Sequence, residues 1–260
     1  MKNFELLMNL DIRQLKLAFA LSLVSLCFTP VQAQPVKFEV LPSLIFNAPP
    51  PPDDINAPGN RVGGGKRGGC ENINKQFAKS KEKLLTALVP VYPFSNAELV
   101  LGLTTSSHPT FWFYVPDVTA VSTEFVLQNE AGQTLYHRTV SLSGTPGVIS
   151  LSLPSTASSL EIGKRYHWYF NIYCNLQQPP IFVNGWIKRV EPNAGLKNQL
   201  EKATPKQRVA LYATNGIWYE SLTASAELRS IDPKGTAWAT MLQAVGLNDI
   251  VSEPIVACCQ

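Results

Sequence analysis

The sequence predicts a mainly β protein with helices: an antiparallel β-sandwich followed by a C-terminal helical segment. Between residues 84 and 190, short runs rich in Val, Phe, Tyr, Trp and Thr alternate with turn residues at near-regular spacing, which is typical of a sandwich. After residue 190 the apolar residues take a helical spacing. The 260 residues are 45% hydrophobic and 16% charged, so the chain is not intrinsically disordered as a whole.

Residues 1–33 have the pattern of a secretory signal peptide. Basic residues precede the continuous apolar run 17–28, and Val31-Gln32-Ala33 supplies the small-residue cleavage pattern before Gln34. The apolar run is short for an uncleaved anchor, which needs roughly 20 residues. We therefore expect a periplasmic or extracellular protein with no transmembrane anchor after cleavage.

Four cysteines remain in the expected mature chain: Cys70, Cys174, Cys258 and Cys259. An oxidising compartment favours disulfides. Because adjacent cysteines rarely bridge each other, we expect Cys258 and Cys259 to pair with Cys70 and Cys174. The alternative, a zinc site or a redox pair, lacks any Cys-x-x-Cys spacing.

Residues 34–69 are predicted to form a disordered arm. The segment contains the run Pro49-Pro50-Pro51-Pro52 and the clusters Gly63-Gly64-Gly65 and Gly68-Gly69, a composition that buries too little apolar surface to offset the entropy of ordering. The body is then expected to comprise a β-sandwich domain at 70–191 and a helical segment at 192–260 packed on it.

Eight strands are expected in the sandwich. They are 84–89, 98–104, 110–115, 123–129, 134–142, 148–153, 164–174 and 181–190. The segment Leu160–Trp168 resembles the tyrosine corner of immunoglobulin-like and fibronectin type III sandwiches, with Tyr166 as the tyrosine. Trp168 stands where immunoglobulin domains have a cysteine, so the fibronectin kind is the closer one.

The C-terminal segment has clear helix signals. Residues 192–200 are expected to hold a short helix, and Thr204 followed by Pro205 marks the start of the next. The stretch from Gly216 to Pro233 is similar in spacing to the second half of a tetratricopeptide repeat, so we expect a single hairpin that packs on the sandwich. A last helix should begin after Thr236 and end before Gly246.

No catalytic motif is present in the sequence. The three histidines, His108, His137 and His167, do not cluster by spacing, and no nucleophile, metal or nucleotide motif is found. We expect no cofactor and no metal. A formal charge of +3 is too small to indicate a nucleic-acid binder.

Aromatic residues occupy both faces of two predicted strands. One face of the strand at 164–174 carries Tyr166, Trp168 and Phe170, and the other carries His167, Tyr169 and Tyr173; Trp112 and Tyr114 alternate with further rings in 110–115. A sandwich buries only one face of each sheet. The second face is therefore either covered by the C-terminal helices, through Trp218 and Trp238, or exposed for a partner. The candidate binding residues are Trp112, Tyr114, His167, Tyr169 and Tyr173.

From Gly63 to Cys259 the chain resembles DUF928, a family of uncharacterised exported proteins found mainly in cyanobacteria. The residues that carry the resemblance are Leu85-Thr86-Ala87-Leu88-Val89-Pro90, Gly102-Leu103-Thr104-Thr105, Pro109-Thr110-Phe111-Trp112-Phe113-Tyr114-Val115-Pro116, Gly185-Trp186-Ile187, Asn215-Gly216-Ile217-Trp218-Tyr219 and Ser252-Glu253-Pro254. The family implies an exported β-rich protein and brings no activity, cofactor or catalytic residue.

The sequence favours an exported, non-enzymatic interaction or envelope-associated protein that binds a protein or a glycan. One alternative is a hydrolase of envelope polymers that uses carboxylates such as Glu124 or Glu161. Another is a thiol redox or metal-binding protein, which would keep its cysteines as free thiols.

Overall fold

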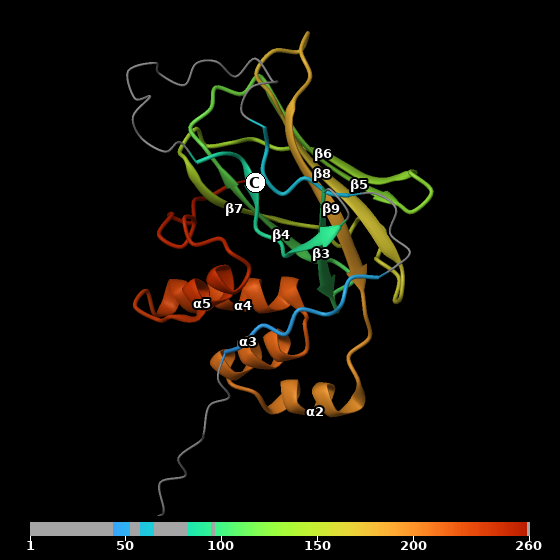
Figure 1. Ribbon diagram of the computed structural model, residues 1–260, viewed down its shortest axis with the longest axis vertical. Coiled ribbons are helices and arrows are strands. Elements are labelled where there is room, and N and C mark those ends of the chain that lie inside the picture. The colour runs from blue at the N-terminus through green and yellow to red at the C-terminus, as the bar shows by residue number, and fades with distance from the viewer. Residues whose placement is uncertain (1–43, 53–57, 65–82, 95–96, 259–260) are drawn as a thin grey trace, which may run out of the picture. The chain divides into compact units, whose positions relative to one another are not determined.

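The computed structural model describes residues 44–52, 58–64, 83–94 and 97–258 (Figure 1). The expected signal peptide, Cys70 and Cys259 lie outside these residues. None of the described helices has the length and apolar character needed to cross a bilayer.

The described chain contains nine strands in two sheets. They are β1 (Thr86–Ala87), β2 (Val91–Phe94), β3 (Ala97–Thr104), β4 (Thr110–Val115), β5 (Ser122–Asn129), β6 (Thr134–Thr139), β7 (Gly147–Ser152), β8 (Arg165–Tyr173) and β9 (Ile181–Arg189). The small sheet has the order β1-β4-β7, and the large sheet has the order β2-β3-β9-β8-β5-β6. The protein is thus mainly β, with the strands close to their predicted places and β2 as an additional one.

The large sheet is mixed rather than purely antiparallel. β3 runs parallel to β9, with Leu101 opposite Trp186 and Thr104 opposite Arg189. The prediction of an antiparallel sandwich is wrong at this pair. Five strands separate β3 from β9 along the chain, so no tight turn forces them to run in opposite directions.

The core lies between the two sheets and is built from aromatic rings. Along β8 burial alternates residue by residue, with Tyr166, Trp168, Phe170 and Ile172 buried. Phe113 of the small sheet stacks on Phe170 with ring centroids 4.5 Å apart. This confirms that these residues share one face of β8, as strand alternation predicts, and shows that this face points into the core.

Tyr166 forms the hydrogen bond of a tyrosine corner. The backbone N–H of Glu161 donates to its hydroxyl oxygen at 2.8 Å, and the Tyr166 side chain is only 3% exposed. The bond fixes the loop that leads into β8.

Four helices follow the strands in the described chain: α2 (Ala194–Lys202), α3 (Pro205–Thr214), α4 (Trp218–Ile231) and α5 (Ala237–Ala244). The predicted start of α3 is confirmed, because Thr204 and Gln207 form a reciprocal capping box. α5 ends as predicted, with Gly246 at a φ of 75°, a left-handed conformation that glycine adopts readily.

Helix α4 packs against the sandwich at β3 and β4. The Trp218 indole N–H donates to the Leu88 carbonyl at 2.8 Å, and the Tyr219 ring meets the edge of Phe111 at 5.4 Å. Trp112 of β4 is covered in the same way: its indole N–H donates to Thr223 at 3.0 Å. The helical segment therefore covers the outer side of β4.

Two short segments before β1 are bound to the body. The Phe46 ring packs edge-on against Trp218 at 4.9 Å, and Asn60 exchanges two backbone hydrogen bonds of 3.0 Å with Asn184 of β9. The prediction of a disordered arm over 34–69 is wrong for residues 44–52 and 58–64. Ring burial and ladder hydrogen bonds compensate for the entropy of ordering there; the remainder of the arm lies outside the described residues.

Candidate functional site

The five candidate binding residues separate into two groups. Trp112 and Tyr114 belong to the protein interior, with exposed fractions of 7% and 5%. Trp112 also lies edge-on to Trp238 of α5, with centroids 5.8 Å apart. Helices α4 and α5 thus cover Trp112, and the burial of both residues makes them unavailable to a partner.

His167, Tyr169 and Tyr173 lie together on the other side of the molecule. They project from the outer face of the large sheet, where their side chains are half-buried. Among the described residues, helices pack only on β3 and β4, leaving β5, β6, β8 and β9 without a helical cover (Figure 1). We call this surface the aromatic-polar face; its members are Glu124, His137, His167, Tyr169, Asn171, Tyr173, Phe182, Asn184 and Trp186.

His167 is the centre of one cluster on this face. Its ring stacks on Trp186 with centroids 4.4 Å apart and an interplanar angle of 7°. The Asn184 amide donates to Nε2 at 2.9 Å, and Nδ1 lies 2.8 Å from the Tyr169 hydroxyl. Both ring nitrogens are therefore engaged and the orientation of the ring is fixed.

The His167 imidazole is neutral at physiological pH. Burial lowers its pKa to about 4, because the charged form is poorly solvated there. Since Nε2 accepts from Asn184, the proton lies on Nδ1 and is donated to Tyr169. The Tyr169 hydroxyl is thus an acceptor toward His167 and keeps its own proton to donate elsewhere.

Glu124 of β5 is the centre of the second cluster. Its Oε1 accepts from the Asn171 amide at 2.9 Å and from the Tyr173 hydroxyl at 2.8 Å. Its Oε2 is 2.8 Å from His137 Nε2 on β6. Three strands therefore converge on one carboxylate.

These hydrogen bonds keep Glu124 ionised. Burial opposes ionisation, but the bonds from His137, Tyr173 and Asn171 together lower the Glu124 pKa below its ordinary value. The same carboxylate raises the pKa of Tyr173, with burial acting in the same direction. The result is a negative charge held at a fixed place on the aromatic-polar face.

The comparison with protein families gives a clear assignment. Residues 62–255 match the model of DUF928, described as a Domain of Unknown Function. The chain belongs to the DUF928 family. It has no match among curated proteins and none among solved structures.

The two carboxylates considered for hydrolysis are not brought together in this DUF928 chain. Glu124 lies opposite Asn171, whereas Glu161 precedes the start of β8 and bonds to Tyr166. Asn171 lies five positions beyond Tyr166 along β8, a rise of about 16 Å. A glycosidase pair needs roughly 5–10 Å, so this pair does not form a catalytic site.

The described residues contain no group of three or more His, Cys, Asp or Glu side chains arranged to hold a metal ion. Cys174 follows the last residue of β8, and Cys258 lies near the Ser141 carbonyl, with Sγ 3.6 Å from that oxygen. The two other cysteines of the predicted disulfides, Cys70 and Cys259, lie outside the described residues.

Sequence reasoning missed the contribution of β9 and β5 to the aromatic-polar face. Phe182 is 40% exposed and pairs with Asn171, while Asn184 pairs with Tyr169 and Trp186 with His167. The period-two pattern of residues 181–190 predicts that Phe182, Asn184 and Trp186 share a face. It gives no register against β8, so their contact with His167 could not be inferred.

Proposed function

We propose that this DUF928 protein is an exported, non-enzymatic binding protein that recognises an envelope glycan through its aromatic-polar face. The observation that carries the proposal is the pair of clusters around His167 and Glu124. Together they place ordered rings and fixed hydrogen-bonding groups side by side on a sheet surface without a helical cover.

The rings suit the apolar side of a sugar. The His167 ring contacts both Tyr169 and Trp186, with ring centroids 4.3 Å and 4.4 Å away. Because their orientations are set within the free protein, little side-chain entropy is lost when a ligand stacks on them.

The polar groups suit sugar hydroxyls. The ionised Glu124 is an acceptor, and the Tyr169 hydroxyl proton is a donor. Hydrogen bonds to a charged group are stronger than those between neutral groups, so Glu124 is expected to set the specificity. A protein partner would favour a larger apolar patch, whereas this face alternates rings with amide and carboxylate groups.

A glycan array combined with pull-down by purified envelope polysaccharide tests the proposal. We expect the wild-type protein to bind, and we expect Tyr169→Ala and Glu124→Gln each to weaken binding about tenfold or more, as for hot-spot residues. The matched control is Leu176→Ala, which removes a side chain that is 70% exposed in the segment between β8 and β9, off the aromatic-polar face.

The outcomes separate the candidate partners. Absence of glycan binding by the wild-type protein, or equal losses in Leu176→Ala and Tyr169→Ala, would contradict the proposal. Capture of a single envelope protein in a manner that requires Tyr169, without glycan binding, would replace the glycan by a protein partner.

Export and disulfide formation belong to the same proposal. The signal-like segment 1–33 and the four cysteines of the remaining chain support localisation in an oxidising compartment. We infer that Cys258 and Cys259 are bonded to Cys70 and Cys174, which would join the C-terminus to the body.

We also infer that the sandwich is of the immunoglobulin or fibronectin type III kind and that α3 and α4 form a hairpin like half of a tetratricopeptide repeat. The Tyr166 hydrogen bond supports the first inference, because tyrosine corners recur in such sandwiches. The turn at Asn215-Gly216, with Gly216 at a φ of 71°, supports the second.

A further inference from the structure

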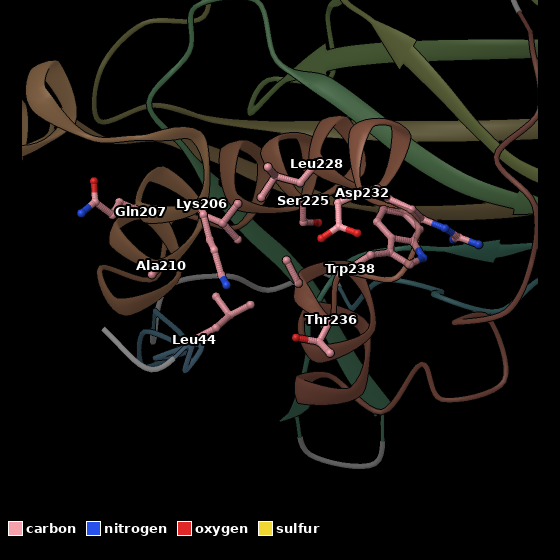
Figure 2. A pocket seen from close by; sticks show the side chains of 13 residues that line it. Leu44, Lys206, Gln207, Ala210, Ser225, Leu228, Asp232, Thr236 and Trp238 are labelled. Carbon is pink, nitrogen blue, oxygen red and sulfur yellow. The ribbon is translucent and has the colours of Figure 1, made fainter. Parts of the chain in front are cut away.

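A cavity of about 340 Å³ lies among α3, α4, α5 and Leu44 (Figure 2). None of the residues that line it belongs to the aromatic-polar face. The volume of the cavity is in the range of sites for small ligands. The cavity is therefore large enough for one small molecule.

The wall of the cavity is mostly apolar. Leu44, Val209, Ala210, Leu228, Ala237 and Trp238 contribute to it. Two hydroxyl-bearing residues, Ser225 and Thr236, also face it, and the Ser225 hydroxyl donates to the Leu222 carbonyl. A ligand would therefore need an apolar part to fill this space.

Three charged residues line the cavity. Lys206 extends from α3 and Asp232 from the end of α4 (Figure 2), and Arg229 lies in the last turn of α4 with its guanidinium over the Trp238 ring at 5.6 Å. Lys206 and Asp232 form no ion pair with any residue that the structure describes. One carboxylate oxygen of Asp232 accepts an N–H from Lys234 at 3.2 Å, which holds the side chain in place.

Lys206 and Asp232 each lie at the end of their helix where the partial charge of the helix dipole has the same sign as the side chain. Lys206 is in the first turn of α3, which contains no acidic residue, and Asp232 is the C-cap of α4. A helix N-terminus attracts anions and a C-terminus attracts cations. The two positions are thus unfavourable for the residues themselves and favourable for a ligand of the opposite charge.

We propose that this cavity binds a free α-amino acid with an aliphatic side chain. The carboxylate of the ligand pairs with Lys206, its ammonium group pairs with Asp232, and its side chain packs against Leu44, Val209 and Leu228. The site is separate from the glycan surface, so either can exist without the other.

Ligand-observed NMR with the purified protein tests the proposal using three probes: leucine, N-acetylleucine and leucinamide. Leucine should bind, and each blocked form should bind about three- to tenfold more weakly, because each has lost one ion pair. Absence of leucine binding at millimolar concentration would overturn the proposal. Equal binding of all three probes would also overturn it, since the cavity would then select only the apolar side chain.

Two variants assign the charges to their partners. Asp232→Asn should abolish the preference for leucine over N-acetylleucine, and Lys206→Gln should abolish the preference for leucine over leucinamide. The matched control for Lys206→Gln is Lys234→Gln, a neighbouring exposed lysine that does not line the cavity. If Lys234→Gln has the same effect as Lys206→Gln, general charge rather than this site determines binding.

Discussion

Tyr166 connects a short sequence motif to the stability of the sandwich. Its ring is part of the aromatic core, and its hydroxyl accepts the Glu161 N–H from the loop before β8. The phenol group therefore satisfies a backbone donor that the strand ladder does not reach.

Replacing Tyr166 by Phe should lower the free energy of unfolding by about 1 kcal/mol, because the Glu161 N–H loses its acceptor while the ring stays packed. Urea denaturation measures this change. Tyr212→Phe, on α3, is the control and should change stability by less than about 0.5 kcal/mol. Equal stability of Tyr166→Phe and the wild type would show that the corner bond has no energetic role.

Glu220 is a buried carboxylate in the contact between α4 and β3. Its Oε1 accepts hydrogen bonds from the backbone N–H groups of Thr105 and Ser106 and from the Thr104 hydroxyl, while its Oε2 is buried without a described partner. Burial raises its pKa despite these bonds. The folded protein therefore holds a proton on Glu220 more tightly than the unfolded chain does.

The raised pKa of Glu220 determines the direction in which the stability of the protein changes with pH. At low pH both states are protonated at Glu220; as the pH rises, the unfolded chain loses its proton first, so stability falls until the pH passes the raised pKa. Glu220→Gln should make this fall smaller. Thermal unfolding between pH 4 and 8 measures it, with Glu227→Gln on the surface of α4 as control. An unchanged profile in Glu220→Gln would contradict the assignment.

Part of the candidate site could be predicted at the level of single residues. Strand alternation placed His167, Tyr169 and Tyr173 on one face of β8, and the structure confirms their common face. The role of Glu124 could not be foreseen, because its partners Asn171 and His137 come from two neighbouring strands. A single sequence does not reveal the register between strands.

Gly102 of β3 lies directly against Trp218 and Tyr219 of α4. A Cβ atom there would lie 2.7 Å from the Tyr219 ring, a distance too short for two carbon atoms. The ring itself is 1% exposed and packed against Phe111, so it has little room to move. A residue without a side chain is needed at this contact.

Gly102→Ala should therefore destabilise the protein by about 1–3 kcal/mol, as overpacking does in other cores. The control is Gly64→Ala, since an added Cβ there meets nothing within 4 Å. Urea midpoints of the two variants give the comparison. Equal midpoints would show that α4 does not pack tightly on β3 in solution.

At the scale of elements, signals from neighbouring residues were sufficient to predict helix α3 and most of the strands. Thr204 and Pro205 marked α3, and period-two runs marked most strands. The parallel pairing of β3 with β9, and of residue Ile255 with Val148, depends on contacts between distant segments. Short β2 contains Pro93, a residue that argues against a strand unless the strand lies at a sheet edge.

For the whole molecule, the cysteines give the simplest test of the expected compartment. We predict that the exported protein contains no free thiol among Cys70, Cys174, Cys258 and Cys259. Thiol titration under denaturing conditions, before and after reduction, measures this directly. Four reactive thiols before reduction would instead favour a redox or metal-binding protein.

Among the described residues, the helices pack on β3 and β4, and the proposed glycan surface lies on the aromatic-polar face. The most direct measurement is an NMR titration of the labelled protein with soluble envelope glycan, following the tryptophan indole N–H signals. We predict that Trp186, stacked on His167, shifts, and that Trp238, 2% exposed beside α4, does not. Shifts confined to Trp238, or no shift at either indole, would contradict binding at the aromatic-polar face.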